Sequence, residues 1–69
     1  MIEEIIFMVE ESIEGGYTAK ALGHDIFTEA DTLKELKANI KDAVSCHFED
    51  AKKPPIIRLH IIKDEVIPA

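Results

Sequence analysis

One segment, residues 31–49, has the periodicity of an amphipathic helix, and it constrains the fold more than any other part of the chain. Its apolar side chains recur every three or four residues, which places them in one stripe along a helix. The stripe consists of Leu33, Leu36, Ile40, Ala43, Val44, His47 and Phe48. Thr32 and Glu35 have the spacing of a capping box, which predicts the start of the helix. Two lysines and two prolines at positions 52–55 predict that the helix ends before them.

The other apolar segments are rich in isoleucine, valine and phenylalanine, which is typical of β-strands. We expect strands at residues 2–11, 17–22, 26–30 and 56–62. The first and last of these are apolar on both faces, which is typical of strands that are covered on both sides. Gly15 and Gly16 can adopt positive φ, so we assign them to a turn between the first two strands. Val66 and Ile67 are expected either to extend the last strand or to form a short arm.

The order of these elements predicts a single α+β domain over residues 1–69 with the arrangement βββαβ. Three strands joined by short turns form an antiparallel meander, and a crossover through a helix returns the last strand parallel to the first. The predicted sheet order is therefore 3-2-1-4, with the first strand in the interior. One helix can cover one face of such a sheet, so the other face is left open within a single chain.

A chain of 69 residues builds a small core, which barely offsets an ordering entropy of about 1.5 kcal/mol per residue. Cys46 is the single cysteine, so no internal disulfide compensates for the small core. We therefore predict a homo-oligomer, most simply a two-fold dimer. The alternative is that the tail with Val66-Ile67-Pro68 folds back over the open face, but about five residues are too few to cover four strands. The predicted interface lies on the first and last strands and consists of Ile6, Met8, Ile56, Arg58, His60 and Ile62.

The charge balance is acidic, with 14 Asp and Glu residues against 8 Lys and Arg residues and a net charge of −6. Nucleic-acid-binding proteins concentrate positive charge to displace counterions from phosphates, so we predict no direct nucleic-acid binding. An acidic surface suits a basic protein partner, although solubility alone also accounts for it. The sequence has no run of about 18 apolar residues and no signal-peptide pattern, so we expect a cytoplasmic protein without membrane contact.

Neither a metal site nor a catalytic site is indicated by the spacing of the polar residues. The carboxylates available to a metal-dependent nuclease fall mostly at the ends of elements and on the solvated helix face; they are Glu4, Glu10, Glu35, Asp42, Glu49 and Asp64. Cys46 and His47 point about 100° apart around a helix, so they cannot converge on one ion or form a nucleophilic pair. We interpret His47 as partly buried, His24 as a turn residue and His60 as a strand residue. We therefore predict no enzyme activity and no cofactor, with a small metal-dependent nuclease as the weaker alternative.

Two segments resemble the signature stretches of HicB-like antitoxins. Glu14-Gly-Gly-Tyr-Thr18 closes the first predicted hairpin, and Asp31-Thr-Leu-Lys-Glu-Leu36 opens the helix. Their order and spacing, together with the βββαβ arrangement over residues 2–62, are similar to the partial ribonuclease-H-like fold of that family. The chain differs in having His24-Asp25 in place of a Pro-Gly pair before the third strand.

The resemblance implies an antitoxin-type protein that binds and neutralises a small basic RNA-cleaving toxin of the HicA kind. Many members of that family carry a helix-turn-helix or ribbon-helix-helix segment after the last strand. This chain has none there, so we expect a stand-alone member without a DNA-binding segment. The alternative is an orphan oligomeric domain, with an interaction or regulatory role and no toxin partner.

Overall fold

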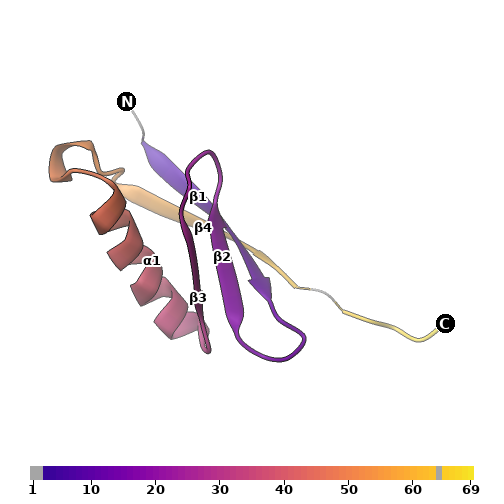
Figure 1. Cartoon of the computed structure of the whole chain (residues 1–69). Coiled ribbons are helices and arrows are strands. Elements are labelled where there is room, and N and C mark those ends of the chain that lie inside the picture. The colour runs from indigo at the N-terminus through magenta and orange to yellow at the C-terminus, as the bar shows by residue number, and fades with distance from the viewer. Residues whose placement is uncertain (1–2, 64) are drawn as a thin grey trace.

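The computed structural model of the chain describes residues 3–63 and 65–69, in which four strands and one long helix follow the predicted order (Figure 1). The elements are β1 (Glu4–Glu11), β2 (Tyr17–Ala21), β3 (Phe27–Ala30), α1 (Leu33–His47), a 3-10 turn η1 (Asp50–Lys52) and β4 (Ile56–Ile62). Residue 2 of the predicted first strand lies outside the described residues. The remaining strand boundaries differ from the predicted ones by at most two residues.

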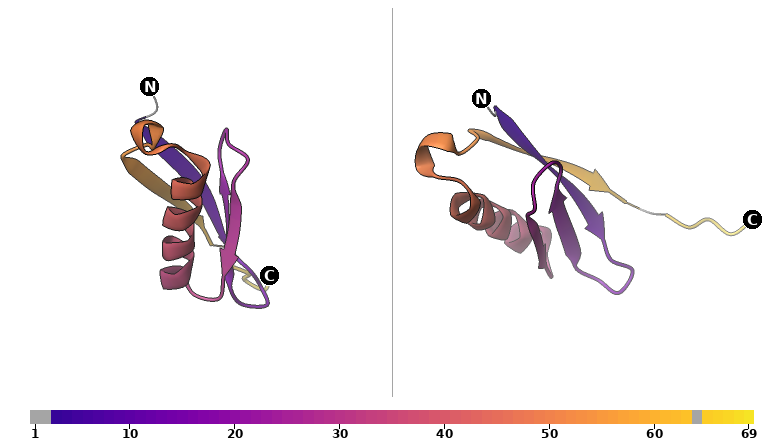
Figure 2. Two further views of the ribbon diagram at one scale, coloured as in Figure 1. Left: turned by 60° about the vertical axis from the view of Figure 1, so that its left-hand side comes forward. Right: turned by 45° about the horizontal axis from the view of Figure 1, so that its top comes forward.

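The four strands form one mixed sheet in the order β3-β2-β1-β4, which confirms the predicted α+β topology. β1 pairs antiparallel with β2 and parallel with β4, and β2 pairs antiparallel with β3. α1 carries the chain from β3 back to the start of β4 and lies on one side of the sheet (Figure 2). β1 therefore occupies an interior position, and β3 and β4 form the two edges.

The core lies between this helix and the facing side of the sheet. Ile5, Phe7 and Val9 alternate along β1 and are at most 2% exposed. The register sets Phe7 between Ala21 on β2 and Leu59 on β4. The helix contributes three fully buried side chains at the spacing that its periodicity predicts, namely Leu36, Ile40 and Val44. The period-two pattern of the strands and the helical period of α1 thus meet in one apolar layer.

Both ends of α1 have local causes. At the start, the Thr32 side-chain oxygen accepts a hydrogen bond from the Glu35 backbone N–H at 3.1 Å. At the end, Phe48 leaves helical geometry, and its N–H donates to the Val44 carbonyl. The helix therefore ends at His47, two residues before the predicted position, and η1 precedes the proline pair.

The predicted burial of His47 is wrong, because this residue is exposed. Val44 is the last buried residue of α1, and Phe48 packs against the core from outside the helix. Helical periodicity alone places His47 on the apolar stripe, but the position next to the core is taken by Phe48. No helix of residues 3–63 and 65–69 is long and apolar enough to cross a membrane.

The C-terminal residues form an arm and do not extend β4. Residues 65–69 lie away from the helix and the sheet, as Figure 1 shows at its yellow end. Val66 and Ile67 are 91% and 81% exposed. The tail therefore does not fold back over the open face of the sheet, which was the alternative to a partner subunit.

Candidate functional site

The sheet face opposite α1 carries the predicted interface residues. The alternation that buries Ile5 and Phe7 turns their neighbours on β1 to this open face, and the register sets the alternate residues of β4 beside them. All six predicted residues therefore share the open face: Ile6 and Met8 are half-buried, and Ile56, Arg58, His60 and Ile62 are exposed. In the described part of the chain, no helix covers this face.

The structure adds two apolar side chains that the sequence pattern did not identify. Phe27 on β3 is 62% exposed, and Leu22 directly after β2 is 49% exposed. The register pairs Phe27 with Lys20, which in turn pairs with Met8. Phe27 therefore belongs to the same face as Met8. The alternation of residues 27–29 could have indicated in the sequence which face Phe27 occupies, but a strand of four residues is too short to show a clear period.

An ion pair crosses the open face between β1 and β4. The Arg58 Nη2 and Nε atoms both lie 3.0 Å from the Glu4 Oε2 atom. Such an exposed pair stabilises the fold by at most about 1 kcal/mol. Its main consequence is geometric, because it holds the guanidinium of Arg58 toward the interior of the sheet.

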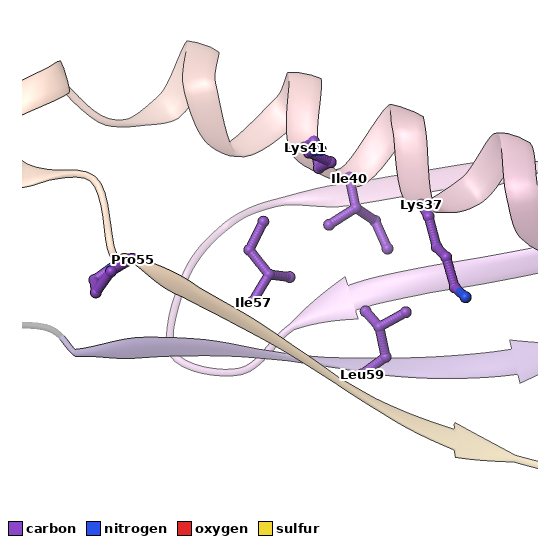
Figure 3. A pocket seen from close by; sticks show the side chains of 6 residues that line it. All are labelled: Lys37, Ile40, Lys41, Pro55, Ile57 and Leu59. Carbon is purple, nitrogen blue, oxygen red and sulfur yellow. The ribbon is translucent and has the colours of Figure 1, made fainter.

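A groove runs between α1 and the edge strand β4. It encloses about 400 Å³ and is lined by Ile40 and Lys41 among the helix residues, with Ile57 and Leu59 on the strand. Figure 3 shows the aliphatic side chains of Ile40, Ile57 and Leu59 in the space between helix and strand. Lys37 and Pro55 complete the lining. The groove is therefore apolar, with two lysines at the helix side.

A second hollow, of about 490 Å³, lies where the first hairpin approaches the start of α1. Its lining brings together the two segments that resemble HicB-like antitoxins, because Gly15 to Thr18 and Asp31 with Glu35 all contribute to it. The full lining is Ser12, Gly15, Gly16, Tyr17, Thr18, Glu29, Ala30, Asp31, Glu35 and Asn39. It contains three carboxylates and no lysine or arginine. Such a surface attracts cationic groups.

The glycine turn positions one wall of this acidic hollow. Gly15 and Gly16 have φ of +99° and +85°, where residues with a Cβ are strained. A Cβ on Gly16 would also meet the Ala30 carbonyl oxygen at 3.2 Å, whereas a Cβ on Gly15 would meet nothing within 4 Å. A side chain at position 16 would therefore strain the backbone and also crowd the end of β3.

We expect Gly16→Ala to destabilise the fold more than Gly15→Ala. Each substitution carries a backbone strain of about 1–2 kcal/mol, and Gly16→Ala adds the contact with the Ala30 carbonyl. Urea unfolding monitored by circular dichroism measures both variants against the parent chain. Equal losses of stability would show that the approach of Gly16 to β3 is unimportant.

The residues weighed for metal chemistry are dispersed. Residues 3–63 and 65–69 contain no group of three or more His, Cys, Asp or Glu side chains that could hold a metal ion. Asp64 of the nuclease hypothesis lies outside the described residues. Glu4 is paired with Arg58, and Cys46 is exposed.

Two of the histidines meet, which spacing along the chain could not predict. The rings of His24 and His47 lie 5.9 Å apart, and both pack edge-on against Phe48, at 5.2 and 4.9 Å. His24 follows β2 and His47 ends α1, so this contact exists only because the helix returns along the sheet. His60 belongs to the open face and takes no part in this cluster.

Comparisons with known proteins identify relatives that cover most of the chain. A UPF0150 protein of Archaeoglobus fulgidus is 56% identical over 55 residues, which span 80% of this chain and 82% of the relative. A UPF0150 protein of Thermotoga maritima is 43% identical over 65 residues, which span 94% of this chain and 91% of the relative. No family model matches the chain, and no solved structure matches it significantly.

Proposed function

The chain belongs to the UPF0150 family, and on this premise we propose that it is an antitoxin-type protein without enzyme activity, which neutralises a small basic RNA-cleaving toxin by protein–protein contact. One observation carries the proposal. The two segments that resemble HicB-like antitoxins are separated in sequence but line the same acidic hollow. The residues that carry the resemblance thus form one surface that a partner can contact.

The charge of the chain supports a basic partner. Glu29, Asp31 and Glu35 contribute carboxylates to the hollow, and the net charge of the whole chain is −6. Complementary charge accelerates the encounter of two proteins and disfavours partners of the same sign. A toxin that binds RNA carries lysine and arginine for the phosphates, and the same groups suit this hollow.

We propose further that the protein assembles as a homodimer through β1 and β4. A globular monomer of 7.7 kDa has an accessible surface of about 4,300 Å², whereas this chain exposes 5520 Å², about 1,200 Å² more. The extended arm contributes part of the excess. The open face and the free edge of β4 contribute as well, with Ile56, Ile61 and Ile62 between 39% and 51% exposed.

The toxin hypothesis is tested with the protein encoded by the neighbouring reading frame. We expect that frame to encode a small basic protein that copurifies with this chain and whose RNA cleavage this chain inhibits. Asp31→Lys reverses one charge in the acidic hollow and should weaken the complex several-fold, mainly through slower association. Asp42→Lys is the matched control, because it changes the net charge equally but lies outside the hollow.

Equal weakening by Asp31→Lys and Asp42→Lys would place the toxin contact elsewhere on the surface. A neighbouring basic protein that does not bind, or whose activity is unchanged in the complex, would contradict the antitoxin role. The orphan interaction domain would then be the better description.

We also expect that this chain alone does not bind duplex DNA with sequence selectivity. Specific DNA binding relies on cationic side chains that displace counterions, and the net charge of this chain is −6. Electrophoretic mobility shift at physiological ionic strength measures this directly. A sequence-selective shift that weakens with added salt would contradict the prediction and indicate a basic surface formed by assembly.

A further inference from the structure

The edge strand β4 has a near-palindromic order of side chains. Its sequence Ile-Ile-Arg-Leu-His-Ile-Ile has Leu59 at the centre, one basic side chain on either side and an isoleucine pair at each end. When two copies are placed antiparallel about Leu59, every residue faces one of its own kind: Leu59 faces Leu59, Ile57 faces Ile61, Ile56 faces Ile62 and Arg58 faces His60. If one copy slides along the other by one or two residues in either direction, Arg58 or His60 faces an apolar residue or the same residue of the second copy.

The backbone of β4 is oriented for this pairing. The Leu22 N–H donates to the Ile6 carbonyl at 2.8 Å, so the polar groups of Ile6 point to β2. Backbone groups alternate in direction along a strand, so those of Phe7 point to β4. In a parallel ladder Phe7, which is opposite Leu59, bonds the residues on either side of Leu59.

The N–H and C=O groups of Ile57, Leu59 and Ile61 therefore point away from β1. No strand of the described residues pairs with this outer edge. A free edge of seven residues, with isoleucine at four of them, is a template for another strand.

We propose that a second copy of this chain pairs antiparallel along β4, with the two-fold axis at Leu59, so that one sheet continues through both copies. This inference rests on the self-association proposed above and narrows the contact to β4, so that β1 continues the sheet but does not touch the second copy. Ile57, Leu59 and Ile61 supply the bonded pairs, which amount to about six backbone hydrogen bonds across the axis. Both helices then lie on the same side of the continuous sheet.

The side chains on the helix side support this register. Ile61 is 51% exposed in a single chain, while Ile57 and Leu59 line the groove beside α1 (Figure 3). Pairing sets Ile57 of the second copy against Ile61, and sets Leu59 and Ile61 of the second copy beside the groove. The groove and the exposed isoleucine are thus covered by the same contact.

The apolar side chains at the two ends of β4 are covered by the same contact. On the open face, Ile56 at 50% and Ile62 at 39% exposure cover each other across the axis. Arg58, whose guanidinium is paired with Glu4 on the β1 side, lies opposite His60 of the second copy in the register.

Cysteine pairs test the register. In a Cys46→Ser background, which removes the exposed free thiol, Leu59→Cys places two thiols across the axis, with Cα atoms about 5.5 Å apart. That separation is within the range of a disulfide. Ile57→Cys is the matched control, because its two copies lie four residues apart along the paired strands, about 14 Å from each other.

We expect oxidised Leu59→Cys to run as a covalent dimer in non-reducing electrophoresis and Ile57→Cys to run as a monomer. The double variant Ile57→Cys with Ile61→Cys should cross-link again, because each thiol then faces its counterpart. Equal cross-linking of Leu59→Cys and Ile57→Cys would overturn the register, and so would the absence of cross-linking in Leu59→Cys.

The pairing of Arg58 with His60 gives a second test, in which two substitutions of His60 are expected to change the dimer affinity in opposite directions. His60→Lys sets a lysine opposite Arg58 at two places and should weaken the dimer by up to roughly 30-fold, whereas His60→Glu should strengthen it. Glu4 offsets part of the Arg58 charge, so the effects fall below this upper value. His60 is exposed, so neither variant removes a core contact. Sedimentation equilibrium measures both dissociation constants, with Ala38→Lys and Ala38→Glu on the exposed face of α1 as controls that change the net charge equally. If both substitutions changed the dissociation constant in the same direction, the pairing of Arg58 with His60 across the axis would be contradicted.

Met8→Lys separates edge pairing from packing of two open faces. Met8 lies on β1, one strand away from the edge, so this variant should leave the edge-paired dimer intact. If Met8→Lys dissociated the dimer and Leu59→Cys did not cross-link it, the edge register would be refuted, but self-association would still hold. A folded parent chain that sediments as a monomer would refute both. Toxin binding is measured independently by copurification, so its failure is distinct from either outcome.

Discussion

Phe7→Ala is expected to remove most of the stability of this fold. Phe7 is fully buried at the centre of β1, between Ala21 and Leu59 in the register. Truncation of a buried phenylalanine costs about 3–5 kcal/mol, because both the transfer energy and the contacts around the new cavity are lost. A domain of 69 residues has a total stability of about 3–10 kcal/mol. The variant should therefore be largely unfolded or melt far below the parent chain.

Met8→Ala provides the control on the same strand. Met8 is the next residue, is half-buried and lies on the open face of the sheet. Its truncation should cost much less than that of Phe7, because its side chain is outside the core between sheet and helix. Urea unfolding at one fixed protein concentration compares the two variants and keeps any contribution from self-association constant. A larger loss for Met8→Ala would mean that the principal core lies on the other face.

Leu36→Ala is expected to cost about 2–5 kcal/mol. Leu36 is fully buried on the sheet-facing side of α1. Alanine has the highest helix propensity, so the substitution leaves the helix itself favoured and isolates the packing against the sheet. Thermal unfolding should show a large decrease in the midpoint.

Lys34→Ala is the matched control for the helix, because Lys34 is exposed and the new residue is the same. Its effect on stability should remain within about 0.5 kcal/mol. If Leu36→Ala and Lys34→Ala shifted the unfolding midpoint equally, the apolar stripe of α1 would not be the contact with the sheet.

Local patterns in the sequence were sufficient to predict the architecture. The alternation along β1, the three- and four-residue spacing of Leu36, Ile40 and Val44, and the position of Thr32 are each properties of a short segment. The sheet order β3-β2-β1-β4 followed from rules on short turns and crossover connections. The same alternation placed the six predicted interface residues on one face of the sheet.

The end of α1 was decided by packing between segments. Periodicity extended the buried stripe to His47, but Phe48 adopts an extended backbone and packs against the core in its place. The edge-on contact of His24 with His47 and Phe48 likewise joins residues that are more than 20 positions apart. The periodicity of a single segment cannot predict contacts between segments that are far apart in the sequence.

The candidate surfaces show the same division. The sequence by itself determined the acidic charge, the glycine turn, the capped helix and the palindromic order of side chains in β4, because each of these is written in consecutive residues. Only the tertiary structure decided that the hairpin and the start of α1 line one hollow, and that the polar groups of Leu59 point outward. The physical reason is that both depend on the strand register and on the position of the helix over the sheet, which the whole chain sets together.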